Sequence, residues 1–248
     1  MAPDKKNSTT DKTAVFRLLR ELAASNRYFT FGQIRDVVRK EGKAEKDKTL
    51  YDYLHQATAE GIIHHAGKGW YSSLSEPLPL GSEAIQPIAD TLQQKFPMLP
   101  VSCWSTAQLN PYLEHLMGIA VHFVTVEADA VTSVVEHLKE SGFNVVENPR
   151  GAVLKNLNLE DGMVIVRPGS LWENYSEELI APWEVLLVHA SQEVKWLKFI
   201  DRMEFRDAVG RALSRGRVSI APLLAYLRKM KIPELDIFPG NCQVSEKK

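Results

Sequence analysis

The sequence predicts an α+β fold in two parts, and three observations support this prediction. Residues 13–73 contain three short helical patterns, followed by two apolar or aromatic runs around a Gly-Lys-Gly turn. Residues 82–242 mix short apolar runs with amphipathic segments and end in helical patterns, which is typical of a mixed α/β domain with a helical C-terminal subdomain. Between these parts, residues 74–81 have the Ser, Pro and Gly content of a linker.

The second of the three helices has two independent start signals. Thr30 is followed three residues later by Gln33, the spacing of a capping box, in which each side chain binds the backbone N–H of the other residue. Phe29 and Ile34 occupy the two positions of a hydrophobic staple. A helix whose start is fixed in both ways also limits the direction of the helix that follows it.

The third helix is predicted over residues 47–60, and Gly61 takes the position that ends it. At about 100° per residue, one face carries Leu50, Tyr53, Leu54 and Ala57. The opposite face and its edge carry Lys48, Thr49, Tyr51, Asp52, His55 and Gln56. Residues 62–65 and 70–72 then predict a hairpin whose turn contains Lys68.

Three helices followed by a hairpin indicate a winged helix-turn-helix, in which one helix meets base edges in the major groove. Residues 1–73 carry 13 Lys and Arg residues against 9 Asp and Glu residues, and this net charge of +4 suits contact with phosphates. A solvated surface or a partner-docking surface would show the same polar face, so these alternatives stay open. We expect DNA contacts from Lys48, Thr49, Tyr51, Asp52, His55, Gln56 and Lys68.

Composition limits the class of protein. The chain has 248 residues, 44% of them hydrophobic, and a net charge of −1, which is ordinary for a globular protein. Cys103 and Cys242 have no metal-ligand spacing, and no apolar segment has the features of a signal peptide or the length of a membrane span. We therefore expect a cytoplasmic protein without membrane contact, metal or cofactor, with disordered tails at residues 1–12 and 243–248.

The second part is predicted element by element. Helices are expected at residues 82–95, 128–141, 183–199, 201–214 and 219–230, and strands at residues 101–104, 119–126, 143–146 and 163–166. The strand at 119–126 is apolar on both faces apart from His122, which predicts a central place in the sheet. The helix at 128–141 has the cleanest amphipathic pattern in the chain.

No catalytic constellation is recognisable in the second part. Gly169 and Ser170 are followed by glutamates at residues 173–178, but not by the Asp-x-Asp pair of nucleotidyltransferases. Acidic residues near strand ends lack the Glu-x-Lys of nuclease cores, and His64 and His65 would point to opposite faces of a strand. The sequence therefore predicts a protein that is not an enzyme.

A basic cluster lies towards the C-terminus. Between residues 201 and 214, arginines alternate with carboxylates, so a self-neutralised helix surface is one interpretation. The other is contact with an acidic protein or RNA at the end of the cluster, where no carboxylate intervenes. The residues of that end are Arg211, Arg215 and Arg217.

The two-part layout resembles the AbiEi-like antitoxins of type IV toxin–antitoxin systems. The resembling segments are residues 29–34, 61–63, 69–71, 121–146 and 181–188. Glu184, Leu187 and Val188 match the pattern that this family often shows in the last segment. Val185 and His189 stand where that pattern has Lys and Asp.

The resemblance implies a bacterial transcription regulator in phage defence, a repressor without enzymatic activity that binds inverted repeats in its own promoter. It also implies a functional link to a nucleotidyltransferase-like toxin and a role of the second domain in antitoxin action. Because one winged helix makes few base contacts, we expect paired half-sites and self-association on double-stranded DNA. Two alternatives stay open: a winged helix attached to a divergent nuclease or nucleotidyltransferase domain, and a protein-docking adaptor.

Overall fold

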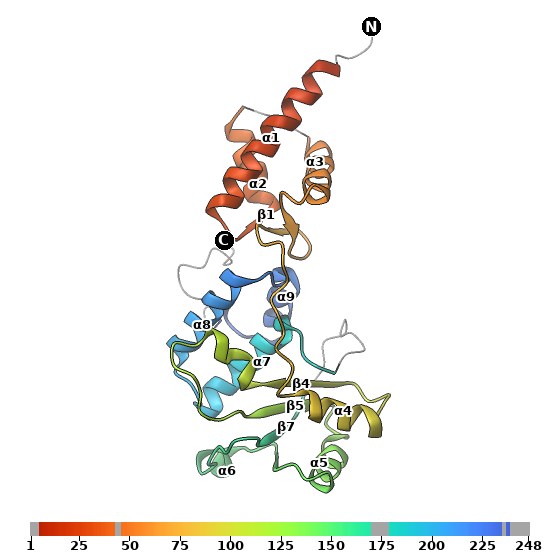
Figure 1. Cartoon of the computed structure of the whole chain (residues 1–248), viewed down its shortest axis with the longest axis vertical. Coiled ribbons are helices and arrows are strands. Elements are labelled where there is room, and N and C mark those ends of the chain that lie inside the picture. Colours follow the sequence, from red (N-terminus) through yellow and green to blue (C-terminus); the bar gives the residue numbers. More distant parts are fainter. Residues whose placement is uncertain (1–4, 43–45, 170–178, 235–236, 239–248) are drawn as a thin grey trace. The chain divides into compact units, whose positions relative to one another are not determined.

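The computed structural model describes residues 5–42, 46–169, 179–234 and 237–238, and its backbone divides into two compact units. The first unit contains the described residues up to Leu78 together with Gly210–Ala225. The second contains Pro79–Val209 and the described residues from Tyr226 onward. Each unit contains helices and a sheet (Figure 1), so the expected α+β class is confirmed.

The division of the chain differs from the boundaries expected from the sequence. Those boundaries assign all of residues 82–242 to the second domain, whereas Gly210–Ala225 group with the N-terminal residues. This segment contains the end of α8 (Arg202–Arg215) and the start of α9 (Ile220–Met230). An amphipathic pattern reports that a helix face is buried but not which element buries it, so the sequence did not reveal this grouping.

The N-terminal part of the first unit has three helices and a small antiparallel sheet. The helices are α1 (Lys5–Ser25), α2 (Phe31–Lys40) and α3 (Asp47–Ala59). The strands are β1 (Tyr28–Thr30), β2 (His64–His65) and β3 (Trp70–Ser72), in the order β1-β3-β2. α1 begins inside the segment that we expected to be a disordered tail, and β1 is too short to give a sequence pattern.

The start of α2 has the predicted geometry. Thr30 Oγ1 accepts the Gln33 N–H at 3.2 Å, and Gln33 Oε1 accepts the Thr30 N–H at 2.7 Å, which confirms the capping box. Phe29 and Ile34 are both buried in the core of this unit. Gly61, just beyond α3, has a φ of 71°, the left-handed conformation in which glycine ends a helix.

The second unit is built on a four-stranded sheet in the order β4-β5-β7-β6. Its strands are β4 (Val101–Ser105), β5 (His122–Val126), β6 (Val145–Glu147) and β7 (Val164–Pro168). β4 pairs antiparallel with β5, whereas β5, β7 and β6 run parallel. β5 lies between β4 and β7 and is buried along its length, so its predicted central position is confirmed.

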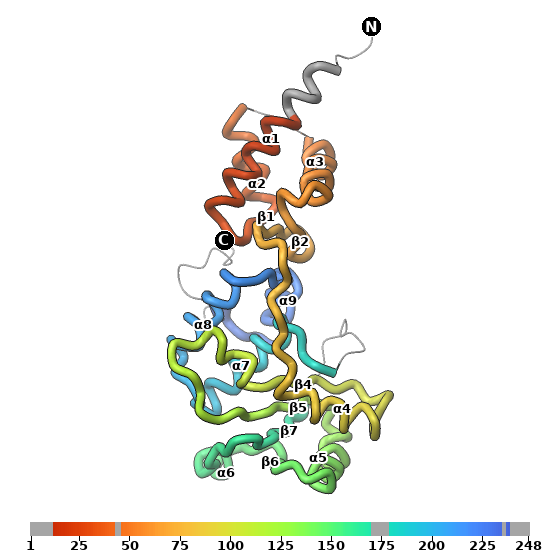
Figure 2. The backbone as a smooth tube through the Cα atoms, in the orientation of Figure 1, coloured from red at the N-terminus to blue at the C-terminus, as the bar shows by residue number. Residues whose placement is uncertain are grey.

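The helices of the second unit include α4 (Gln86–Lys95), α5 (Val131–Glu140), α6 (Gly151–Lys155) and α7 (Trp183–Leu197), besides a 3-10 helix at Thr106–Tyr112. The chain passes from β5 through α5 to β6, and then through α6 to β7 (Figure 2). The sequence predicts α4, α5 and α7 near their observed positions. It misses α6 and the 3-10 helix, because both are too short to show a hydrophobic period.

The two faces of this sheet have different surroundings. Cys103, Val124 and Val166 lie side by side on one face and form a buried core with apolar residues of α4 and α5. The opposite face carries Trp104, Phe123, Thr125 and Arg167. Side chains of α7 lie within hydrogen-bond distance of the last two of these residues. The polar side chains of Thr125 and Arg167 therefore meet those of α7 on this side of the sheet.

Cys103 has a free thiol that is fully buried, and burial raises its pKa well above the ordinary value. Cys242 lies outside the residues that the structure describes. Within the described part of the chain, none of the helices is both apolar enough and long enough to cross a membrane.

Candidate functional site

The predicted DNA-binding residues of α3 lie together on its outer side. The inner side is buried in the core of the first unit and consists of Leu50, Tyr53, Leu54 and Ala57. The exposed residues of α3 that we expect to contact DNA are Lys48, Tyr51, Asp52, His55 and Gln56. Thr49 is half-buried at the edge of this face. We refer to these six residues as the α3 outer face.

Charged residues of α2 form ion pairs with the first turn of α3. The carboxylate of Asp47 lies 3.6 Å from Arg39 Nη2 and 3.9 Å from Arg35 Nη1. A carboxylate in the first helical turn also interacts favourably with the helix dipole. All three side chains are partly exposed, so each ion pair is weak. Both arginines lie on α2, so the two pairs connect α2 with the turn that carries Lys48 and Thr49.

Tyr51 connects the α3 outer face with the hairpin turn. Its ring stacks on Phe31, with ring centroids 4.2 Å apart and ring planes 4° apart. The Phe31 N–H donates to the carbonyl of Gly69, which lies in the turn between β2 and β3, at 2.9 Å. Lys68 precedes Gly69 and is exposed. Phe31 thus links the turn that carries Lys68 to Tyr51 of α3, through the ring stack and the hydrogen bond.

The hairpin turn also packs against the start of α9. The Ala221 N–H donates to the Ala66 carbonyl at 3.3 Å. Gly67 has a φ of 99°, and a Cβ atom on it would lie only 2.6 Å from Ala221 Cβ. Glycine is therefore needed here for its backbone conformation and for the close approach of α9. No local pattern in the sequence predicts this contact, because the two segments are far apart in the chain.

The three arginines that the sequence offers to an acidic partner belong to the first unit. Arg211 is half-buried and Arg215 is exposed on α8, and Arg217 is half-buried just beyond the helix. The main chain of Arg217 pairs with residues 76–78 through hydrogen bonds of 2.8 and 3.0 Å. Burial and the charge of Arg217 lower the pKa of His64 on β2, and the charge of Glu76 opposes this shift.

The two units carry net charges of opposite sign. The described part of the first unit contains 15 Lys and Arg residues against 8 Asp and Glu residues, a net charge of +7. The described part of the second unit contains 12 against 16, a net charge of −4. Three of the positive charges in the first unit come from residues 211–217, which lie within the second domain expected from the sequence.

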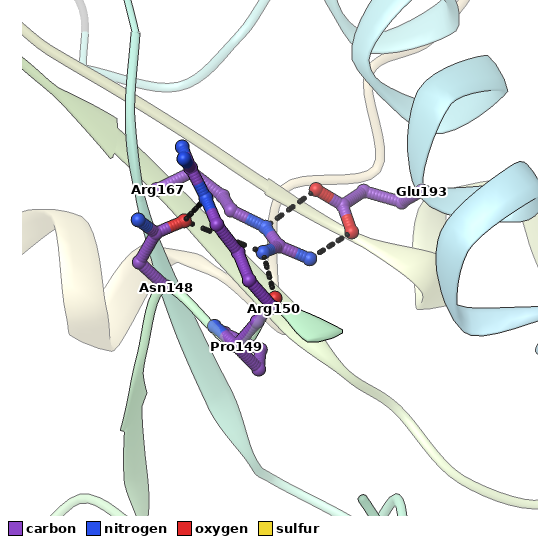
Figure 3. A network of polar contacts seen from close by, with 5 residues as sticks. All are labelled: Asn148, Pro149, Arg150, Arg167 and Glu193. Carbon is purple, nitrogen blue, oxygen red and sulfur yellow. Dashed lines mark hydrogen bonds and ion pairs between the residues drawn. The ribbon is translucent and has the colours of Figure 1, made fainter. Parts of the chain in front are cut away.

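The second unit contains a buried ion pair at the C-terminal end of β7. Arg167 Nε and Nη2 donate to the two carboxylate oxygens of Glu193 on α7 at 2.9 and 2.8 Å (Figure 3). Arg167 Nη1 donates to the Pro149 carbonyl at 2.7 Å. The two charged side chains are only 9% and 5% exposed, and burial raises the pKa of Glu193, an effect that Arg167 opposes. The pair joins the sheet, α7 and the loop after β6.

His189 lies on the same side of the sheet and is fully buried. Its Nε2 is 2.6 Å from the hydroxyl of Tyr226 on α9, and its Nδ1 is 3.5 Å from Thr125 Oγ1. Burial lowers the pKa of His189 to about 4 and raises the pKa of Tyr226 to about 12. Both groups are therefore neutral at pH 7, and the imidazole has one donor and one acceptor nitrogen.

Arg167 and Glu193 are not among the functional residues expected from the sequence. Arg167 directly follows the apolar run at residues 163–166, and Glu193 interrupts a helix that is buried on most sides. A charged residue inside an apolar pattern is the signal that points to such a pair, because a buried charge needs a partner. No cluster of three potential metal ligands occurs among the described residues, and the glutamates at residues 173–178 lie outside them.

A comparison with protein families complements this geometry. A family model described as a family of unknown function (DUF6577) matches residues 49–237, from α3 to beyond the end of α9. The searches of curated proteins and of solved structures gave no match. The match to the family covers more than half of the chain. The chain therefore belongs to DUF6577, a family of unknown function.

Proposed function

We propose that this protein is a DNA-binding transcription regulator whose first unit is a winged helix-turn-helix. The observation that carries the proposal is the net charge of +7 on the unit that presents the α3 outer face. Double-stranded DNA attracts such a unit through its phosphates. The three helices and the sheet order β1-β3-β2 support the same interpretation.

The proposed complex assigns a separate role to each part of this surface. α3 enters the major groove, where Thr49 and His55 reach base edges and Lys48 pairs with a base or a phosphate. Tyr51 presents a ring that is already held by Phe31, so little side-chain entropy is lost on binding. Lys68 contacts the DNA backbone from the hairpin turn, whose position is fixed by α9.

The resemblance to AbiEi-like antitoxins supports a narrower form of the proposal. In this form the protein represses its own operon and counteracts a nucleotidyltransferase-like toxin. The layout of an N-terminal three-helix unit and an α+β second unit is compatible with it. Co-expression with a nucleotidyltransferase-like reading frame next to the gene tests this role, and we expect the full chain to restore growth.

The DNA-binding proposal is tested by fluorescence anisotropy with a labelled duplex from the region upstream of the gene. We expect specific binding by the wild type and a loss of about tenfold or more in the Lys48→Ala/Lys68→Ala variant, since two phosphate or base contacts are removed. Lys139→Ala/Lys155→Ala removes two exposed lysines of the second unit and serves as the matched control. We expect this control to bind like the wild type.

Two results would contradict the proposal. One is the absence of any preference for the upstream duplex over a duplex of shuffled sequence. The other is an equal loss of affinity in the two double variants, since the charge of the whole chain and not the α3 outer face would then govern binding. Circular dichroism of each variant checks that the substitutions leave the fold intact.

A further inference from the structure

A cavity of about 350 Å³ lies in the second unit, at the edge of the sheet where the parallel strands end. Thr125 and Arg167 line it from the ends of β5 and β7, and Gln192 and Trp196 line it from α7. Ligands of α/β sheets commonly bind at the carboxyl ends of parallel strands. The volume is within the range of small-molecule sites, about 300–1,000 Å³.

Part of the lining is aromatic and apolar. Trp104 stacks on Phe123 with ring centroids 4.2 Å apart and ring planes 9° apart, and each residue is 1% exposed. Further apolar lining comes from Leu154, Pro168, Trp196 and Met230. The stack and the burial of both residues hold the two rings in place. This lining suits the ring of a planar aromatic molecule.

Arg150 supplies the net charge of the cavity. Arg167 is neutralised by Glu193, and among the described residues no carboxylate lies within ion-pair distance of Arg150. Arg150 and Asn148 both line the cavity. Arg150 Nε donates to Asn148 Oδ1 at 3.2 Å (Figure 3), which orients the guanidinium group. Its two Nη atoms then present the forked geometry that binds a carboxylate or phosphate group.

The loop that carries Arg150 has an unusual backbone. Asn148 has a φ of 35° and Gly151 a φ of 55°, so residues on both sides of Arg150 adopt left-handed conformations. Such a conformation is strained for Asn148, which also precedes a proline. The hydrogen bond from Arg167 to the Pro149 carbonyl helps to hold the loop in this shape. Arg150 is therefore attached to a loop whose backbone is fixed before any ligand arrives.

We propose that this cavity binds a small planar aromatic anion. The ring lies within the apolar lining, and the negative group pairs with Arg150 at the mouth. Gln192 and Thr125 offer hydrogen bonds to substituents of the ring. The site uses no residue of the first unit and does not depend on the proposed DNA binding.

The proposal is tested by isothermal titration calorimetry of the full chain with three probes. 2-Naphthoate has a ring and a negative charge, 2-naphthamide has the same ring without the charge, and acetate has the charge without the ring. We expect saturable binding of 2-naphthoate, weaker binding of 2-naphthamide and no measurable binding of acetate. We expect Arg150→Gln to weaken binding of 2-naphthoate about tenfold, since a charge-assisted pair is lost, and to leave 2-naphthamide unaffected.

Two further variants complete the test. Arg20→Gln makes the same substitution at an exposed arginine of α1 that does not line the cavity, and it should bind 2-naphthoate like the wild type. Trp196→Ala removes an apolar wall that is half exposed, and it should weaken 2-naphthoate and 2-naphthamide alike. The proposal is overturned if the wild type does not bind 2-naphthoate at millimolar concentration. It is also overturned if Arg150→Gln binds 2-naphthoate as tightly as the wild type does.

Discussion

The hydroxyl of Tyr28 donates a hydrogen bond to the carbonyl of Gly216 at 3.0 Å and accepts one from the Val218 N–H at 2.9 Å. Tyr28 lies on β1, and Gly216 is 188 residues further along the chain. The tyrosine is 3% exposed, so water cannot replace either partner. These bonds join the turn between α8 and α9 to the small sheet of the first unit.

Replacing Tyr28 by Phe should lower the free energy of unfolding by about 1–3 kcal/mol, because the buried carbonyl and N–H of the turn lose their partner. Urea denaturation measures this loss. The control is Tyr51→Phe, which removes a hydroxyl from a half-exposed side chain and should change the stability by less than about 0.5 kcal/mol. An equal effect of the two substitutions would show that the bond to Gly216 does not stabilise the unit.

Two glycines of the hairpin turn provide a matched comparison. Gly67 and Gly69 both have a positive φ, of 99° and 74°, so alanine at either position costs about 1–2 kcal/mol in backbone strain. At Gly67 the added Cβ would also collide with Ala221, whereas at Gly69 it would meet nothing within 4 Å. We expect Gly67→Ala to lower the thermal unfolding midpoint more than Gly69→Ala does. A larger loss at Gly69 would contradict the packing of the turn on α9.

Removing only one partner of the buried pair of Arg167 and Glu193 should destabilise the protein strongly. Glu193→Leu leaves a buried guanidinium without its carboxylate and should lower the free energy of unfolding by about 3–5 kcal/mol. The double variant Arg167→Met/Glu193→Leu buries no charge, and urea denaturation should find it more stable than the single variant. Glu21→Leu, in the exposed pair with Arg17, is the control and should have little effect.

His189 should make the stability fall as the solution becomes acidic. Its pKa is about 4 in the folded protein against 6.5 for an ordinary histidine, so between these values only the unfolded chain binds the proton. The free energy of unfolding should therefore decrease from about pH 7 and level off near pH 4, by roughly 3 kcal/mol from this group. Urea denaturation at several pH values should show a smaller decrease for His189→Gln. His115→Gln, at an exposed histidine, should keep the wild-type dependence.

Lys68 and Thr49 should affect DNA binding in different ways. Lys68→Ala should weaken binding to all sequences and reduce the slope of log K against log salt concentration by about 0.9, the value for one phosphate contact. Thr49→Ala should leave this slope unchanged and lose about 1–3 kcal/mol of discrimination at particular base pairs. Anisotropy titrations at several salt concentrations, with single base-pair changes in the duplex, separate the two effects. A change of this slope in Thr49→Ala would show that Thr49 contacts a phosphate and not a base edge, contrary to the proposal.

Local patterns in the sequence predict much of the secondary structure. The capping box of Thr30 and Gln33 and the glycine after α3 act through neighbouring backbone groups, so a few residues are enough to encode them. The apolar spacing of α5 and α7 and the doubly apolar run of β5 likewise report which side chains are buried. The same helical period predicts the residues of the α3 outer face, because they lie opposite the buried face of the helix.

Tertiary structure decided which elements bury those faces and which polar groups meet. The bond between Tyr28 and Gly216, and the pairing of Arg167 with Glu193, each join segments that carry no local sign of their partner. The periods of α8 and α9 indicate a buried stripe, but only the folded chain assigns Gly210–Ala225 to the N-terminal unit and thereby raises its positive charge. A hydrophobic period shows within a few turns of a helix which face is buried. Which distant element buries that face depends on how the side chains of the whole core pack together.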